Sequence, residues 1–208
     1  MAGPVMQPGE VAASYDKIAA RWTAPQFNHE NGISAHRRAL NFVQSGGRAL
    51  DVGCGSNGRF IDLLLKTGFE VEGLDLSDEM IRLARARHPD VRFHHADIRL
   101  WQTQTRYNFI SAWDSIWHVP LLDQPDVLTK ICGLLDSGGV FVFTAGGLDV
   151  PSEVRDETMG VPMYHATPGI PAILKTLGAS GCLVRHLEYD QYPAPHVYLI
   201  VQRVGGRD

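Results

Sequence analysis

The stretch RALDVGCGSNGRFIDLLLKTG, residues 48–68, decides the fold of this chain of 208 residues. Its apolar start, 48–53, predicts a short β-strand, and the part after the last glycine has the spacing of an amphipathic helix. Between them stand Gly53, Gly55 and Gly58, in the pattern G-x-G-x-x-G. Glycine tolerates tight turns and lets a ligand approach the backbone closely. A glycine-rich turn between a strand and a helix is typical of nucleoside-binding α/β domains.

Strand and helix patterns alternate on the C-terminal side of this turn. Strands are predicted at 69–76, 91–97, 107–113, 140–146, 182–190 and 196–204, and helices at 78–88, 124–135 and 171–181. Two more helices are predicted before the turn, at 10–22 and 34–44. The alternation favours a parallel sheet with helices on both faces. The last two strands are joined by a short loop and are expected to pair as an antiparallel hairpin.

The bulk composition narrows the class of protein. Hydrophobic residues make up 44% of the chain and charged residues 20%, which suits one folded domain over 1–208. The net charge of −4 gives no basic excess, so no nucleic-acid partner is expected. No apolar run of about eighteen residues and no basic, apolar leader are present, so we expect no membrane partner. Three widely spaced cysteines favour reduced thiols and a cytoplasmic protein.

Three carboxylates near predicted strand ends indicate the ligand. Asp75 follows the glycine turn by about twenty residues and could accept hydrogen bonds from ribose hydroxyls. Asp97 could accept from an adenine amine, with Ile98 covering the ring. Asp51, two residues before the first glycine, would repel a pyrophosphate but suits the ammonium and sulfonium cations of S-adenosylmethionine (SAM). The residues therefore favour SAM, and an NAD(P)-linked oxidoreductase is the alternative.

Taken together, these motifs resemble those of class I SAM-dependent methyltransferases. The matching segments are DVGCGSNG (51–58), VEGLDLSDEM (71–80) and FHHADI (93–98). LLDSGGVFVFT is similar to the family's segment before the fifth strand, with Ser137 where proline is usual. The resemblance covers about residues 10–204. It implies a Rossmann-like, mostly parallel sheet of seven strands in the order 3-2-1-4-5-7-6, with strand 7 antiparallel.

The resemblance also implies a cofactor site assembled from distant parts of the chain. Asp51 and the turn backbone would hold the methionine part of SAM, Asp75 the ribose, and Asp97 with Ile98 the adenine. Tyr15 matches a helix that often closes over the cofactor, so residues 1–33 are expected to form a helical cap. The expected cofactor residues are Tyr15, Asp51, Gly53, Cys54, Gly55, Gly58, Asp75, Leu76, Met80, Asp97, Ile98 and Trp113.

Methyl transfer from a sulfonium is an in-line displacement, so alignment contributes most of the catalysis. His118 follows the fourth predicted strand, where ligands bind in open α/β sheets, and is the expected general base. Asp114 is the second candidate, and a packing role is an equally good interpretation of both. The acceptor is expected to be a small molecule with an oxygen or nitrogen nucleophile, and a non-catalytic SAM-binding module would have a similar sequence.

The acceptor pocket is predicted from aromatic and imidazole side chains: Trp117, Tyr164, His165 and His196. Residues 147–166 hold two prolines and no clear period, so they are expected to form an irregular substrate lid. For Tyr164, His165 and His196, a structural role is the better interpretation. No metal is expected, because the neighbouring His94 and His95 would point to opposite faces of a strand. Either a monomer or a homodimer is expected.

Overall fold

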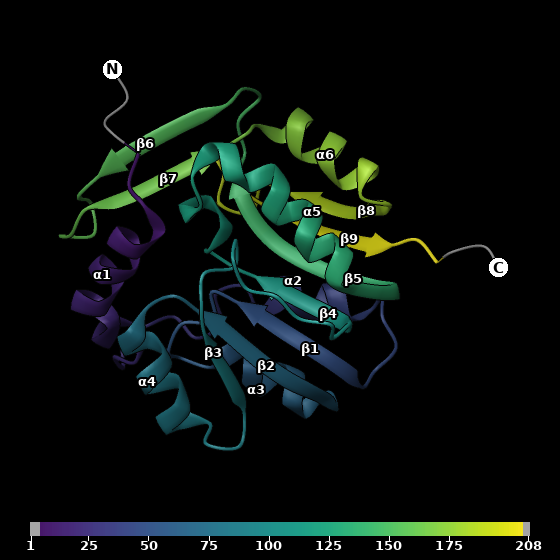
Figure 1. The fold of residues 1–208 in the computed structure, drawn as a ribbon, viewed down its shortest axis with the longest axis horizontal. Helices are drawn as coiled ribbons and strands as arrows, with labels where there is room; N and C mark the ends of the chain where they lie inside the picture. The colour runs from purple at the N-terminus through teal and green to yellow at the C-terminus, as the bar shows by residue number, and fades with distance from the viewer. Residues whose placement is uncertain (1–4, 206–208) are drawn as a thin grey trace.

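The computed structural model describes residues 5–205 as a central sheet with helices on both faces (Figure 1). Residues 1–4 and 206–208 of the predicted domain lie outside the described part. The helices are α1 (Pro8–Ile18), α2 (Ile33–Leu40), α3 (Arg59–Lys66), α4 (Asp78–Arg87), α5 (Gln124–Leu134) and α6 (Ile170–Ala179), with short 3-10 turns η1 (Ala19–Trp22), η2 (Ile116–His118) and η3 (Leu121–Asp123). The strands are β1 (Gly47–Val52), β2 (Phe69–Asp75), β3 (Arg92–His95), β4 (Tyr107–Ala112), β5 (Leu135–Gly146), β6 (Ser152–Asp156), β7 (Met163–Thr167), β8 (Cys182–Glu188) and β9 (His196–Arg203).

The main sheet has seven strands in the order β3-β2-β1-β4-β5-β9-β8. Strands β3, β2, β1, β4 and β5 are parallel, and β9 runs antiparallel to both β5 and β8. The predicted order and the antiparallel final hairpin are therefore confirmed, with the strand numbers changed only because β6 and β7 intervene. Among the described residues, no helix is long and apolar enough to cross a membrane.

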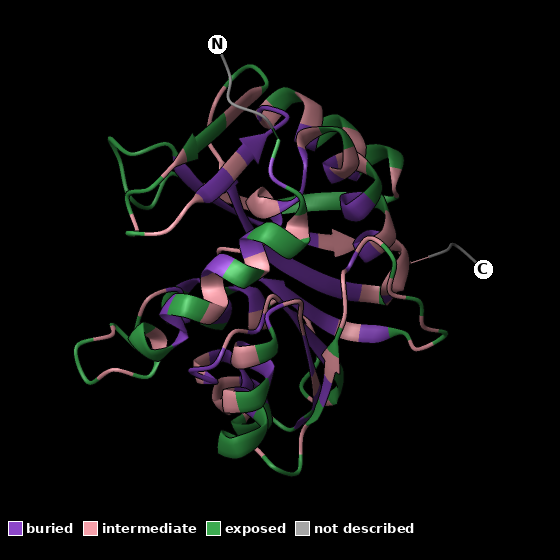
Figure 2. Cartoon of the chain, turned by 60° about the vertical axis from the view of Figure 1, so that its left-hand side comes forward, coloured by how far each residue is buried: buried purple, intermediate pink, exposed green. Residues whose placement is uncertain are grey.

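Alternating side chains of the strands contribute to two hydrophobic cores, one on each face of the sheet. Figure 2 shows the central strands coloured largely as buried. On β5, Phe141 and Phe143 pack with α5 and α6. Val140 and Val142, one residue out of phase, pack in the core that contains α2, α3 and α4. This alternation fixes which strand residues face which helices, and it also fixes the direction of the polar side chains near the strand ends.

The prediction that residues 147–166 are irregular is wrong. Strands β6 and β7 pair antiparallel within this segment and form a separate two-stranded sheet. Strand β6 has no buried residue, and its one aliphatic side chain, Val154, is 51% exposed. A strand without a buried apolar face carries no alternation that could have revealed it. Figure 1 shows this hairpin beside the N-terminal end of α1, past the carboxyl end of β5.

Candidate functional site

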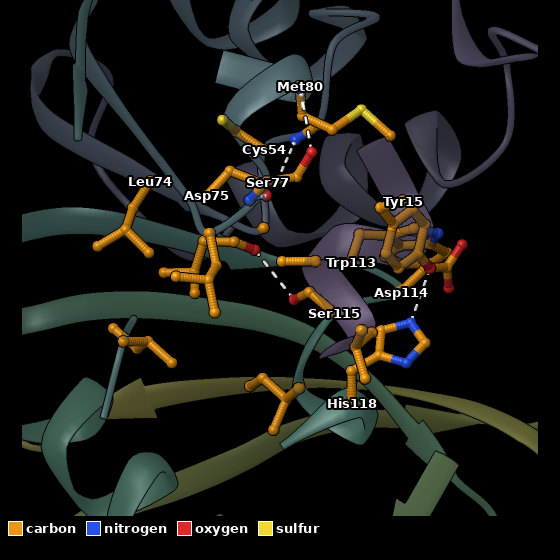
Figure 3. A pocket seen from close by; sticks show the side chains of 18 of the residues that line it. Tyr15, Cys54, Leu74, Asp75, Ser77, Met80, Trp113, Asp114, Ser115 and His118 are labelled. Atoms are coloured by element: carbon orange, nitrogen blue, oxygen red, sulfur yellow. Dashed lines mark hydrogen bonds between the residues drawn. The ribbon is translucent and has the colours of Figure 1, made fainter. Parts of the chain in front are cut away.

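A cavity of ≈310 Å³ opens where β1, β2 and β4 end, beneath α1. Parallel strands converge at their carboxyl ends, so the loops that follow them share one mouth. Of the predicted cofactor residues, the cavity wall contains Tyr15, Gly53, Cys54, Gly55, Asp75, Leu76, Met80, Asp97, Ile98 and Trp113. Of the other predicted site residues, it contains Asp114, Trp117, His118 and His165. Figure 3 shows Tyr15, Asp114 and His118 together at one side of this cavity.

The three glycines of the turn all have positive φ, which L side chains rarely adopt. A Cβ on Gly53 would lie 2.3 Å from the Ser115 Cβ, and one on Gly58 would lie 2.3 Å from the His88 ring. A Cβ on Gly55 would meet no atom within 4 Å, because this residue borders the cavity. Gly53 and Gly58 thus allow close packing, while Gly55 leaves the cavity wall bare. Gly58 itself is not part of the wall.

Asp75 is fixed at the end of β2 by backbone donors. Its two carboxylate oxygens accept N–H bonds from Gly55 at 2.8 Å and from Ser77 at 2.9 Å. Burial raises the pKa of Asp75, and these hydrogen bonds oppose that shift. Ser77 caps α4, because its hydroxyl accepts the Met80 N–H. The same hydroxyl donates to Asp16 of α1 at 2.6 Å, which ties the covering helix to the cavity rim.

The carboxylate of Asp97 is already occupied by Arg99. The guanidinium of Arg99 donates to both carboxylate oxygens of Asp97. Its Nε and Nη2 atoms lie 3.0 and 2.7 Å from Oδ2, the oxygen that it holds most closely. The same guanidinium bonds Asp123 at 2.7 Å. Asp97 lies on the cavity wall as the sequence predicted, but its capacity to accept a further hydrogen bond is shared with this cation.

Asp51 does not line the cavity, although the sequence reasoning relied on it. It alternates with Leu50 and Val52 and therefore points to the opposite core, beside Ser111 of the neighbouring strand. Only 2% of Asp51 is exposed, and burial raises its pKa to about 7, opposed by the Ser111 hydrogen bond and by the charge of Arg59. Its influence on a ligand must therefore be electrostatic rather than by direct contact in this arrangement.

Arg59 is a cavity residue that the sequence reasoning missed. Its guanidinium lies 4.0 Å from the centroid of the Phe60 ring, and its Nε donates to the Asn31 carbonyl at 2.9 Å. Burial lowers the pKa of Arg59, while Asp51 and Asp114 raise it. The available signal was its position directly after the last glycine, where a helix begins beside the ligand site.

The imidazole of His118 is fully engaged. Its Nδ1 bonds the Tyr164 carbonyl oxygen at 2.7 Å, and a carbonyl can only accept, so Nδ1 carries the proton. The Nε2 atom then accepts from the Tyr15 hydroxyl at 2.7 Å and from the Trp117 indole at 3.1 Å (Figure 3). Burial lowers the pKa of His118 to about 4, with a smaller contribution from His165. His118 is neutral, and its basic nitrogen is occupied.

Asp114 has φ of +52°, the one positive φ outside glycine among the described residues. Non-glycine residues persist in this conformation only where their surroundings hold them. The Thr144 hydroxyl accepts the Asp114 N–H at 2.8 Å, and the His196 Nε2 lies 3.1 Å from the Asp114 carboxylate. His196 also bonds Asp190 through Nδ1. Burial alone would lower the pKa of His196, but the hydrogen bonds to both carboxylates raise it above its usual value.

The four residues predicted for the acceptor pocket separate in the structure. Trp117 and His165 lie on the cavity wall, whereas Tyr164 and His196 do not. Tyr164 is buried, and its hydroxyl donates to Glu153 and accepts the Leu121 N–H. His196 stands behind the wall, where it bonds Asp114 and packs against the rings of Trp113 and Trp117.

The described part of the chain gathers no three metal-binding side chains. His94 bonds the Glu72 carboxylate, and His95 bonds the Leu76 carbonyl oxygen. The two neighbouring histidines thus have separate partners, as the geometry of a strand requires.

Comparison with known proteins identifies the family. Residues 27–170 match the family described as methyltransferase domain. A ubiquinone biosynthesis O-methyltransferase of Shewanella halifaxensis is 27% identical over 150 residues, which cover 66% of this chain and 61% of that protein. A dTDP-3-amino-3,6-dideoxy-alpha-D-glucopyranose N,N-dimethyltransferase of Streptomyces fradiae is 31% identical over 119 residues, or 53% of this chain and 43% of that protein. The matched region is therefore less than two thirds of the length of either relative.

A solved structure has the same fold. The SAM-dependent methyltransferase from Mesorhizobium loti superposes with a TM-score of 0.66 at 22% identity, covering 83% of this chain and 97% of that one. The strand order and the glycine turn of this chain agree with the resemblance seen in its sequence. Because the family match extends over more than half of the chain, this protein belongs to the methyltransferase domain family.

Proposed function

We propose that this protein transfers a methyl group from SAM to an oxygen or nitrogen atom of a small molecule. The observation that carries the proposal is the partly buried carboxylate of Asp75 on the cavity wall, held by the turn residue Gly55. Each oxygen accepts one backbone N–H and keeps a further lone pair, as two ribose hydroxyls would require. A cavity of ≈310 Å³ is within the range of small-molecule sites.

Two further features fit SAM. Gly55 leaves the turn open, so a Cβ there would occupy space that the ligand needs. The indole nitrogen of Trp113, a cavity residue, is buried without a hydrogen-bond partner among residues 5–205. A buried donor without a partner costs about 1–3 kcal/mol, so a ligand that accepts its hydrogen bond is favoured. The carboxylates of Asp75 and Asp114 on the cavity wall also suit the two positive charges of SAM better than a diphosphate.

When bound, SAM supplies an electrophilic methyl group on a sulfonium. The chain would position it through the turn backbone and Asp75, and α1 would exclude water from above. Tyr15 and Trp22 face the cavity from this N-terminal part, and Asp16 bonds Ser77 on the far rim. Residues 5–33 therefore act in this proposal as the helical cap, and the β6–β7 hairpin acts as a wall of the acceptor site.

The acceptor is a small molecule in this proposal. The outer cavity is aromatic, with Trp22, Phe27 and Trp117 on its wall, and suits a flat or apolar body. The names of two relatives refer to one O-methylation and one N-methylation of small molecules, so both nucleophiles belong in the test.

Calorimetry with SAM and with NADH tests the cofactor, because the oxidoreductase alternative requires the second. Turnover is then followed as S-adenosylhomocysteine formed with a panel of acceptors: 3,4-dihydroxybenzoate, catechol and glucosamine. We expect binding of SAM alone and product with at least one member of the panel. Binding of NADH in place of SAM would refute the proposal, and tight SAM binding without product from any acceptor, including a cell extract, would favour a non-catalytic SAM-binding module.

A further inference from the structure

Two histidines line the cavity, and they differ in whether a ring nitrogen is free to bond an acceptor molecule. His118 donates from Nδ1 and accepts at Nε2, so neither nitrogen is open to an acceptor. His165 lies on the same wall, with its ring centroid 4.9 Å from that of His118 and 6.0 Å from that of Trp117. Among residues 5–205, no hydrogen bond uses its Nε2 atom. The imidazole that can take a proton from a molecule in the cavity is therefore the one on the hairpin.

A carboxylate supports the other nitrogen of this ring. The His165 Nδ1 lies 3.7 Å from a carboxylate oxygen of Asp156, within ion-pair range. Asp156 pairs with Met163 across the hairpin, and Met163 stands two residues before His165 on β7. Side chains two residues apart on a strand point to the same face, so Asp156 and His165 share one face of the hairpin. The Thr158 N–H donates to Asp156 at 2.9 Å, and this hydrogen bond lowers the pKa of the carboxyl. Asp156 is thus an ionised group in a fixed position.

The opposite face of the hairpin provides a matched comparison. There Glu153 accepts a hydrogen bond from Tyr164, across the same diagonal spacing of the two strands. This second pair points away from the cavity, because Tyr164 also bonds the Leu121 backbone. The hairpin therefore carries two acid–ring pairs of similar spacing, and only Asp156 with His165 faces the site.

We propose that His165 accepts the proton of a hydroxyl acceptor during methyl transfer, and that Asp156 orients its imidazole. The inference rests on the proposed function. The acceptor oxygen forms a bond to the methyl carbon while the carbon–sulfur bond breaks, and the sulfur keeps that electron pair as a neutral thioether. The hydroxyl proton moves to Nε2 of His165, and the imidazolium is stabilised by Asp156. Charge is conserved, because one cation is lost at sulfur and one forms at the ring.

The protonation state at neutral pH agrees with this role. Burial lowers the pKa of His165, and the attraction of Asp156 opposes that shift, so the resting ring is neutral. The titratable groups that face it are Asp156 from β6 and His118 from η2. His118 is neutral in the same range, so Asp156 is the charge that decides how readily the ring is protonated.

The pairing is tested without turnover, by NMR titration of the His165 ring in the intact, ligand-free protein. Asp156→Asn should lower the His165 pKa by at least about 0.5 unit, because the protonated ring loses its counter-charge. Glu153→Gln, the matched control, should leave it unchanged. Equal His165 titration curves in the wild type and Asp156→Asn would overturn the pairing.

The proton transfer is tested with 3,4-dihydroxybenzoate and catechol as hydroxyl probes. His165→Gln should lower kcat/KM about 100-fold or more, as expected for loss of a general base, with SAM affinity unchanged by calorimetry. The acidic limb of the pH profile should disappear in this variant and shift to lower pH in Asp156→Asn. Wild-type rates in His165→Gln, or methylation of glucosamine alone by the wild type, would overturn the inference. Binding of SAM in the same experiments would leave the proposed function standing.

Discussion

Substitution of Asp51 by Asn should stabilise the protein increasingly as the pH rises. Asp51 is buried, and burial raises its pKa from 3.8 to about 7. An acid with a raised pKa binds its proton more tightly in the folded state. Folding stability is therefore lost as the pH rises from the unfolded pKa to the folded one. Asn keeps the shape and the polar contact with Ser111 but cannot ionise, so the variant escapes this loss.

The size of the effect follows from the two pKa values. A difference of about three units corresponds to roughly 4 kcal/mol when fully expressed, at about 1.36 kcal/mol per unit. Between pH 5 and pH 8, the wild type should lose roughly 2–3 kcal/mol more than Asp51→Asn does. The sign of this difference depends only on the direction of the pKa shift.

Urea denaturation at pH 5, 6, 7 and 8 measures the free energies of unfolding. Asp62→Asn is the control of opposite sign. Burial opposes the shift of Asp62, but hydrogen bonds from His88 and Arg87 lower its pKa, so its ionised form stabilises the fold. That variant should lose stability relative to the wild type at neutral pH. A stability difference between Asp51→Asn and the wild type that does not change with pH would refute the reasoning.

Three further outcomes are expected. Asp75→Asn should weaken SAM binding roughly 10-fold or more by calorimetry, because the ligand loses a charged acceptor, and unchanged affinity in the folded variant would contradict the map of the cofactor site. SAM binding near pH 7 should release a proton from Asp51, because nearby cations lower its pKa. Calorimetry in phosphate and in Tris should give different heats for the wild type but equal heats for Asp51→Asn. His118→Ala should lower turnover and leave SAM affinity nearly intact, because it frees Tyr15 while the cofactor contacts remain, and equal turnover in both proteins would remove His118 from the mechanism.

The sheet could be predicted from the sequence because its signals are local. Most of the strands contain short apolar runs, and several are bounded by a glycine turn or, as at Ser77, by a helix cap. The glycine turn required positive φ at Gly53, Gly55 and Gly58, and this is a property of the residues themselves. Asp75 and Asp97 came to the cavity because parallel strands place their ends together. These parts of the site follow from chain order and need no knowledge of side-chain contacts.

Asp51 shows the limit of reasoning from the local sequence: the ligand class was correct, but Asp51 does not line the cavity. Its position before the first glycine suggested that it touches the ligand, but alternation along β1 turns it toward the core that contains α2 and α3. The Asp51 carboxylate still lies near the glycine turn, where the Arg59 guanidinium attracts its negative charge. A bound cation must therefore act against both burial and this guanidinium. This competition explains why the protonation of Asp51, rather than its distance from the cavity, is the quantity to measure.

The histidines could not be ranked from the sequence, because availability depends on distant partners. His118 is occupied by Tyr15, which lies 103 residues away, and by the Tyr164 carbonyl, 46 residues away. His165 is open because its strand pairs with β6, and β6 has no buried residue to reveal it. The hairpin thus does two things at once: its backbone fixes His118 through Tyr164, and its next side chain faces the cavity. One residue inserted before Tyr164 would place the Tyr164 side chain on the cavity face and turn His165 away from it, since neighbouring strand residues face opposite sides.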